Sequence, residues 1–289
     1  FFFHPEAGIR DSVASRGLGD VYKRQNIESP KWLQQRLTAI GLRPISALVD
    51  ITNYVTFDLG RPLHVYDADK ISGNLTMRLA SKNEQCLALD EVNYKCHDDM
   101  IVISDDDKNL HGIGGVMGGL NSGCSMDTKN VFLEVALFDP ISVTKTGRKI
   151  NLQSDARYRF ERGVDLELQV VAMHRATKLL LEIVGGEAGP IIESRAEGAL
   201  LKTPLVPLSS KRLNALLGLE VDPEHVDNML ARLGFSVESK KVEENDVAWL
   251  VKAPSHRFDI NQEADLVEEV CRVYGYENVP AKTPSAQLS

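Results

Sequence analysis

The order of the predicted strands and helices limits the folds open to this chain. Four short runs, rich in apolar and β-branched residues and separated by polar turns, are typical of strands: residues 75–80, 85–90, 100–105 and 130–138. Three amphipathic segments predict helices: residues 29–40, 139–150 and 164–186. Because strands and helices do not alternate one for one, the sequence predicts an α+β domain with a mixed sheet over residues 26–200.

A second, smaller domain is expected over residues 201–280. Two short helices, each opened by a capping residue and closed by a glycine, are predicted from Ser209 to Gly218 and from Asp222 to Gly234. Residues 235–240 and 247–254 alternate like the strands of a hairpin. Helices followed by a two-stranded wing suggest a winged-helix-like α/β domain. Its helices show no basic recognition face, so we expect protein contact here and no DNA binding.

The two ends of the chain differ from the rest. Residues 1–25 have no sustained periodicity, and residues 16–25 (RGLGDVYKRQ) resemble a translated sequencing-adapter tract. We therefore expect residues 1–25 to be non-native or disordered and to lie outside the fold. Residues 281–289 are interpreted as a linker to a C-terminal part.

Composition excludes several classes of protein. The net charge of −8 argues against binding nucleic acid by bulk electrostatic attraction. The four cysteines form no CxxC pair, which fits a reducing cytoplasm better than a zinc or disulfide framework. No apolar run is long enough to span a bilayer, so no membrane partner is expected.

A local basic cluster stands out against the acidic whole. Its members are candidates for contacts with RNA phosphates: Lys145, Arg148, Lys149, Arg157 and Arg159. Tyr158 and Phe160 are interleaved with them and offer rings for stacking. The alternative is a set of internal ion pairs with neighbouring carboxylates.

Residues 111–119 (HGIGGVMGG) are the obvious candidate for a phosphate-binding loop. Counted from Gly112, the last glycine of the dinucleotide fingerprint falls on Met117, and the Walker lysine is absent. What remains is a turn that lets another backbone or a ligand approach closely, or a purely structural turn.

Three polar residues lie in apolar surroundings. Asn53 and His64 flank a Gly-Arg-Pro break, and Glu134 lies in the middle of an apolar strand, where an unpaired buried carboxylate is costly. Each has a structural alternative: Asn53 as a turn cap, His64 as a core histidine, and Glu134 on the solvent side of a half-exposed strand.

An acidic segment lies in residues 256–280. Four carboxylates, three of them at helical spacing, are candidate ligands of a hard cation such as Mg²⁺: Asp259, Asp265, Glu268 and Glu269. The alternative is an acidic helix start that is neutralised by Arg257 and Arg272. The spacing alone favours this alternative.

Several motifs together resemble a known family. VDITNYV, GRPLHVYD, GGVMGG, FLEVALFDP and SDARYRFERGVD occur in order, followed by RFD, DLVEEV and RVYGY. This series is similar to the bacterial phenylalanyl-tRNA synthetase beta-subunit family over residues 26–289. The resemblance implies a tRNA-editing domain that hydrolyses tyrosine wrongly attached to tRNA(Phe), followed by the winged-helix-like domain.

The resemblance also implies site residues. The editing pocket of the family falls here on Asn53, His64, Gly118, Glu134, Ser154 and Ala156, with the four carboxylates as Mg²⁺ ligands. Glu134 is then expected to accept a hydrogen bond from the tyrosine phenol, and His64 and Asn53 to orient the ester or the attacking water. Many members of the family carry Thr where this chain has Ser154, and a DASHRFERG-like string where this chain has DARYRFERG.

Partners follow from the same resemblance. We expect an alpha subunit in a heterotetramer of two alpha and two beta subunits, ATP-dependent ligation on the alpha subunit, tRNA(Phe) as substrate and a cytoplasmic location. Two other functions stay open. One is a structural or RNA-binding subunit module with an inactive pocket, and the other is a freestanding nucleotide or nucleic-acid binder.

Overall fold

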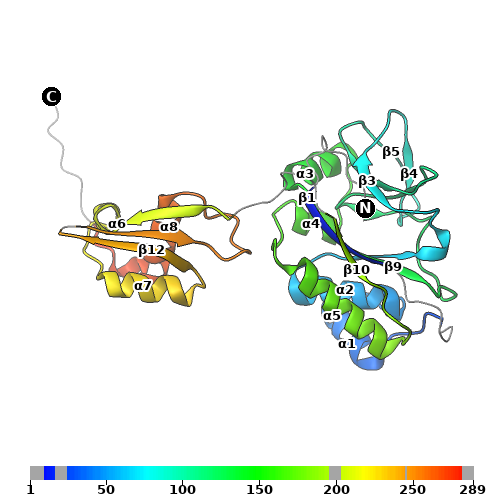
Figure 1. Cartoon of the computed structure of the whole chain (residues 1–289), viewed down its shortest axis with the longest axis horizontal. Helices are drawn as coiled ribbons and strands as arrows, with labels where there is room; N and C mark the ends of the chain where they lie inside the picture. Colours follow the sequence, from blue (N-terminus) through cyan, green and yellow to red (C-terminus); the bar gives the residue numbers. More distant parts are fainter. Residues whose placement is uncertain (1–9, 17–24, 195–202, 245, 282–289) are drawn as a thin grey trace. The chain divides into compact units, whose positions relative to one another are not determined.

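A computed structural model describes residues 10–16, 25–194, 203–244 and 246–281 of the chain (Figure 1). The chain divides into two compact units, residues 1–200 and residues 201–289. None of the helices in the described ranges is both long enough and apolar enough to cross a membrane.

The first unit contains two antiparallel four-stranded sheets and a two-stranded ribbon. The first sheet has the order β10 (Ile191–Ser194), β1 (Arg10–Arg16), β9 (Val131–Leu137) and β2 (His64–Asp67). The second has the order β3 (Thr76–Leu79), β6 (Ile101–Ser104), β7 (Leu110–Ile113) and β8 (Met117–Gly118). The ribbon pairs β4 (Gln85–Leu87) with β5 (Asn93–Lys95). Each of the four predicted strands is present, although β4 is shorter than expected.

Three helices pack together beside the first sheet (Figure 1): α1 (Lys31–Ala39), α2 (Ala47–Leu59) and α5 (Leu168–Ile183). Two shorter helices, α3 (Pro140–Lys149) and α4 (Asp155–Phe160), follow β9, and a 3₁₀ turn, η1 (Ala68–Lys70), follows β2. The predicted helices correspond to α1, α3 and α5. The combination of helices and separate sheets confirms the α+β class.

Strand β9 divides the core of the first unit. Because side chains alternate along a strand, Leu133 and Val135 enter the cluster formed with α1, α2 and α5. The opposite face carries Glu134 and Ala136, and Ala136 joins a second apolar cluster with Phe138. Both faces of β9 are buried, so the carboxylate of Glu134 also lies in the interior.

The structure differs from the sequence-based expectation at one end of the chain. Residues 10–16 form β1, which pairs with both β9 and β10 in antiparallel register. The unpaired backbone edge of β9 binds this segment through main-chain hydrogen bonds, which do not require an amphipathic pattern. The remaining residues of the expected foreign segment up to residue 24 lie outside the described residues.

The second unit is a three-stranded antiparallel sheet packed with three helices. Its strands have the order β11 (Leu205–Ser209), β13 (Asp246–Lys252) and β12 (Ser236–Glu243). Its helices are α6 (Ser210–Leu217), α7 (Pro223–Arg232) and α8 (Glu263–Tyr274), with a 3₁₀ turn, η2 (Tyr276–Asn278), after them. Trp249 and Leu230 lie at the centre of its core. The two short helices and the hairpin were predicted, whereas β11 was not.

Candidate active site

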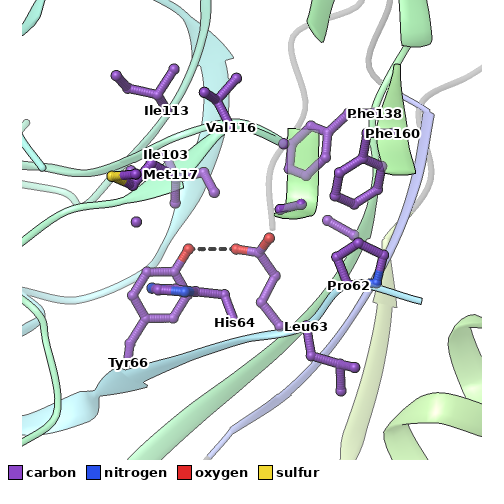
Figure 2. Close-up of a pocket in the computed structure, with 16 residues that line it drawn as sticks. Pro62, Leu63, His64, Tyr66, Ile103, Ile113, Val116, Met117, Phe138 and Phe160 are labelled. Atoms are coloured by element: carbon purple, nitrogen blue, oxygen red, sulfur yellow. Dashed lines mark hydrogen bonds between the residues drawn. The ribbon is translucent and has the colours of Figure 1, made fainter. Parts of the chain in front are cut away.

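A cavity opens in the first unit among β2, the β7–β8 hairpin, β9 and α4 (Figure 2). Its empty volume is about 420 Å³, part of which is open to solvent. Most of its wall is apolar, and its side-chain polar groups come from His64, Tyr66 and Glu134. An apolar cavity with a few convergent polar groups is the usual form of a small-ligand site.

Glu134 is the carboxylate of this cavity. Residue pairing places His64 directly opposite Glu134 across β2 and β9, so their side chains lie on the same face of the sheet. Tyr66, two residues after His64, shares that face. Its hydroxyl donates a hydrogen bond of 2.5 Å to Glu134 Oε2 (Figure 2). The two strands thus bring a phenol, an imidazole and a carboxylate together.

Burial controls the ionisation of this carboxylate. It raises the pKa of Glu134 to about 7, against the hydrogen bond from Tyr66 and the charge of Arg61, which both lower it. Burial also raises the pKa of Tyr66 well above its usual value. Tyr66 therefore remains a neutral donor, and Glu134 changes its charge near neutral pH.

His64 is a neutral imidazole held against glycine. Burial lowers the pKa of His64 to about 4. Its ring meets the Tyr66 ring edge-on, with 4.4 Å between the centroids, and its Nε2 has no hydrogen-bond partner in the described structure. A Cβ atom at Gly118 would lie 2.2 Å from His64 Cε1. Only glycine at residue 118 leaves room for this ring position.

Arg61 is a fully buried guanidinium beside the cavity. Its Nη2 donates to the backbone oxygen of Ala136, a cavity residue, while Nε and Nη1 have no hydrogen-bond partner among the described residues. Its Cζ lies 5.7 Å from the centroid of the Phe160 ring. Burial lowers the pKa of Arg61 to about 9, although the charges of Asp165 and Glu134 raise it. Arg61 is therefore a cation close to Glu134.

The structure brings four of the six predicted pocket residues into this cavity: His64, Gly118, Glu134 and Ala156. Asn53 lies half-buried on α2 and does not line the cavity. Ser154 caps α4 by accepting from the Arg157 backbone N–H, and its hydroxyl donates to the backbone oxygen of Val116, which lines the cavity. Ser154 therefore joins α4 to the hairpin behind the cavity wall.

Sequence reasoning missed Tyr66 and Arg61. Tyr66 lies two positions after His64 in a strand, so the alternation of side chains was a signal for it. Arg61 lies in the Gly-Arg-Pro break, where an arginine is ordinarily exposed, and no signal in the sequence shows its burial.

The glycine-rich segment forms the turn between β7 and β8. A Cβ at Gly114 would lie 2.7 Å from Ile101 Cγ2, and one at Gly115 would lie 2.8 Å from Val143 Cγ2. A Cβ at either position would therefore collide with a side chain. Gly115 also lines the cavity, as do Gly112 and Gly118 of the same segment.

The basic cluster does not act as one surface. Arg157 is buried, donates to the backbone oxygen of Leu152, and pairs with Glu161 at 3.1 Å. It is therefore removed from the candidate RNA contacts, because an internal partner and burial withhold it from solvent.

The other members of the cluster keep some exposure. Lys145, Arg148 and Lys149 are exposed on α3, and Lys149 pairs with Asp99. Arg159 is half-buried and lies over Phe57, with 4.3 Å between its Cζ and the ring centroid.

The acidic segment forms ion pairs and a helix cap. Arg257 binds Asp259 at 2.6 Å and Glu269 at 2.9 Å, and Arg272 binds Glu269 at 2.6 Å. Asp265 closes a capping box with Gln262 at the start of α8. These contacts match the alternative in which arginines neutralise an acidic helix start.

The expected set of Mg²⁺ ligands is not assembled. Glu268 is exposed, whereas Glu269 is buried, and the described part of the chain contains no group of three or more His, Cys, Asp or Glu residues placed to hold a metal. Guanidinium groups bind carboxylate oxygens of Asp259 and Glu269, and backbone N–H groups bind one of Asp265. As they are arranged here, these residues do not fit the ion.

Comparison with family models and known proteins gives consistent results. A model of the B3/4 domain matches residues 15–185, and a model of the tRNA synthetase B5 domain matches residues 206–276. The chain is 44% identical over 275 residues to the phenylalanine–tRNA ligase beta subunit of Idiomarina loihiensis, which covers 94% of this chain and 34% of the relative. It is 50% identical over 256 residues to that of Mesorhizobium japonicum, which covers 88% of this chain and 31% of the relative.

The chain spans about a third of the length of these curated relatives. Among solved structures, it is similar to an N-terminal fragment of the phenylalanyl-tRNA synthetase beta subunit from Pyrococcus horikoshii. The match has 16% identity and a TM-score of 0.41, and covers 93% of this chain and 72% of that one.

Proposed function

Because the chain belongs to the B3/4 domain family and is a member of the phenylalanine–tRNA ligase beta subunits, we propose that it hydrolyses tyrosine wrongly attached to tRNA(Phe). The observation that carries the proposal is Glu134, a buried carboxylate that lines an apolar cavity. A phenol that enters the cavity can donate a hydrogen bond to this carboxylate, which phenylalanine lacks the hydroxyl to do.

The cavity residues divide the task of binding and orientation. Apolar residues such as Val116, Met117 and Phe138 surround the ring of the bound amino acid, and Glu134 accepts from its phenol. Gly118 keeps the wall open for the His64 ring. His64 is neutral at physiological pH, so its free nitrogen can orient the ester or the attacking water by a hydrogen bond.

The reaction in this proposal is direct hydrolysis. Water attacks the ester carbonyl, the bond to the ribose oxygen breaks, and the products are free tyrosine and uncharged tRNA. A thiol nucleophile has little support, because burial raises the pKa of Cys86 and Cys124 to about 12 and that of Cys96 to about 11. None of these cysteines lines the cavity.

The proposal extends to the assembly that this family forms. The chain spans about a third of the length of its relatives, and we propose that it acts as part of a beta subunit. Two beta subunits then assemble with two alpha subunits in the cytoplasm. Ligation with ATP and Mg²⁺ is then carried by the alpha subunit. Lys145, Arg148, Lys149 and Arg159 are the proposed contacts with tRNA phosphates. Binding of Mg²⁺ to Asp259, Asp265, Glu268 and Glu269 requires Arg257 to release its two carboxylates.

Deacylation of tyrosyl-tRNA(Phe) tests the proposed function. The chain is placed within a complete beta subunit, assembled with its alpha subunit, and compared with Glu134→Ala. We expect a loss of tyrosine release of at least about a hundredfold, because a buried hydrogen bond to a charged group is lost together with the recognition of the phenol. Asp107→Ala, a change of an exposed carboxylate, is the matched control and should leave the rate unchanged.

A non-catalytic module is the second candidate, and one observation favours it. The phenol of Tyr66 already donates to Glu134, so the acceptor of the pocket is partly engaged without substrate. In that case wild type releases no tyrosine although phenylalanylation is normal. The same release in wild type and Glu134→Ala would instead reject the role of Glu134.

A further inference from the structure

The hydrogen bond between Tyr66 and Glu134 has the chemistry that is proposed for the substrate. A phenol hydroxyl donates to one carboxylate oxygen, Oε2, over 2.5 Å, and both groups are buried. The phenol of Tyr66 thus already binds the carboxylate of Glu134 that is proposed to bind the phenol of the ligand. Two roles are conceivable for it: Tyr66 competes with the ligand, or it holds the carboxylate in place for the ligand.

Packing argues that the Tyr66 ring stays where it is. The ring is 1% exposed and belongs to the apolar cluster that includes Met77 and Cys86. It meets the His64 ring edge-on at 4.4 Å and the Phe132 ring at 6.1 Å. Moving it aside would open a cavity in this core, which is strongly unfavourable for an aromatic side chain. A ring that is fixed in this way is a permanent donor.

The other carboxylate oxygen is differently placed. Among the side chains that the structure describes, which do not include those of β1, none donates a hydrogen bond to Glu134 Oε1, while Oε2 is bound to Tyr66. The carboxylate itself lines the cavity. A carboxylate has lone pairs for about four hydrogen bonds, so Oε1 remains able to accept.

We infer that Tyr66 is a positioning residue: its phenol holds Glu134 through Oε2 and leaves Oε1 to accept the hydroxyl of a bound tyrosyl group. This inference rests on the proposed function for the identity of the ligand. It adds that discrimination between tyrosine and phenylalanine depends on a phenol of the protein as well as on Glu134.

Removal of one hydroxyl tests the inference. Tyr66→Phe keeps the ring and its packing, and lets Glu134 turn and take up a proton more easily. Tyr66 and His64 of β2 face Glu134, as does Arg61, which precedes β2 in the chain. His64 and Arg61 are unchanged in the variant. Tyr94→Phe is the matched control, because Tyr94 also donates to a carboxylate, Asp90, at 2.7 Å, but outside the cavity.

Deacylation by the assembled enzyme is the first readout. We expect Tyr66→Phe to lower kcat/KM for tyrosyl-tRNA(Phe) about tenfold at pH 7 and to move the acidic limb of its pH profile upward by about one unit. Tyr94→Phe should match wild type. An unchanged rate and profile in Tyr66→Phe would overturn the inference, and a faster variant would show that Tyr66 competes with the substrate.

A readout without tRNA separates this inference from the proposed function. With the carboxyl carbon of glutamate labelled with ¹³C, the Glu134 signal is followed against pH and against added tyrosine methyl ester. We expect a pKa about one unit higher in Tyr66→Phe, and a shift with tyrosine methyl ester, but not with phenylalanine methyl ester, in wild type. If the pKa of Glu134 is not raised in Tyr66→Phe, or if the signal of wild type does not shift selectively with tyrosine methyl ester, the inference is overturned, whatever the deacylation assay gives. Failure of wild type to deacylate, with both results present, rejects only the proposed function.

Discussion

At the scale of residues, the cavity contains two buried groups whose titrations oppose each other. Glu134 has its pKa raised by burial to about 7, and His64 has its pKa lowered by burial to about 4. A raised carboxylate pKa gives stability that is present below the unfolded pKa and is lost as pH rises through the folded value. A lowered imidazole pKa gives stability that is lost as pH falls. At mildly acidic pH the two contributions to the pH dependence of the unfolding free energy partly cancel. Neither can therefore be measured separately in wild type.

Substitution of Glu134 by Gln isolates the carboxylate. The amide does not titrate, while His64 titrates in both proteins and cancels in the difference. Between pH 4.5, the unfolded pKa, and about 7, the folded pKa, wild type should lose about 3 kcal/mol of unfolding free energy relative to Glu134→Gln. Urea unfolding of the first unit, followed by Trp32 fluorescence in a Trp249→Phe background, measures this difference.

The direction of the difference decides the outcome. A difference between the two proteins that stays flat over this pH range would mean that Glu134 ionises as in water. A difference that grows in favour of wild type with rising pH would mean that the carboxylate is stabilised more by Tyr66 and Arg61 than burial costs it. Glu238→Gln, a change of an exposed carboxylate in the second unit, is the control and should leave the first unit unaffected.

Two of the three polar side chains of the cavity were identified from the sequence, and the third, Tyr66, was not. Glu134 and His64 were recognisable because a charged or polar residue in an apolar strand is unusual. Ser154 was also identified, but the distance between its hydroxyl and the cavity depends on how α4 meets the hairpin. Such contacts between segments far apart in the chain have no local signal, which is also why Arg61 was missed.

At the scale of elements, sequence reasoning left two helices of the first unit undefined, the short α4 and the longer α2. The longer one, α2, shows why. Its sequence is rich in β-branched residues, which favour strands on local propensity. Burial decides for the helix: Leu48, Ile51 and Val55 recur at helical spacing and pack with α5. Asp50, buried on the same helix, accepts from Ser29 Oγ at 2.5 Å and from the Ile45 backbone N–H at 2.9 Å. Tertiary packing therefore overrides propensity here.

The segment around α8 supports a prediction about its ion pairs. The hydrogen bonds from Arg257 and Arg272 lower the pKa of Glu269 to about 2, and this carboxylate is buried. Replacing Arg257 by Met leaves Glu269 with one cation only. We expect the unfolding free energy of the second unit to fall by roughly 1–3 kcal/mol. Urea unfolding followed by Trp249 fluorescence, in a Trp32→Phe background, measures it.

A matched change and a metal titration complete this experiment. Arg212→Met breaks the ion pair of Arg212 with Glu263, in which Arg212 is 63% exposed, and should cost less than about 1 kcal/mol. Millimolar Mg²⁺ should not stabilise wild type, because Arg257 holds Asp259 and Glu269. Stabilisation of wild type by Mg²⁺, but not by the same ionic strength of sodium chloride, would show that the ion displaces the arginine.

At the scale of the whole molecule, the chain contains two units with separate cores. The two apolar clusters of the first unit and the one of the second share no residue. The family models also divide the chain, into residues 15–185 and residues 206–276. Helix-start and helix-stop signals, followed by a hairpin pattern, allowed a second domain to be predicted from the sequence. The strand pairing of residues 10–16, which lie between β10 and β9, and that of β11 at a sheet edge could not be predicted, because the partners of these strands are far away in the chain.

Separate cores predict that the two units unfold independently. The chain has two tryptophans, and each unit contains one: Trp32 in the first and Trp249 in the second. Leu230 is fully buried in the core of the second unit. Leu230→Ala should therefore lower the unfolding free energy measured by Trp249 fluorescence by about 2–5 kcal/mol. The unfolding free energy measured by Trp32 fluorescence should not change. Val55→Ala, in the core of the first unit, should do the reverse.

Both transitions are measured by urea unfolding in the single-tryptophan backgrounds, where the native fluorescence of the unaltered unit confirms that it is folded. If either substitution shifts both transitions together, the two units stabilise each other, and stability measured in one of them cannot be assigned to its own core.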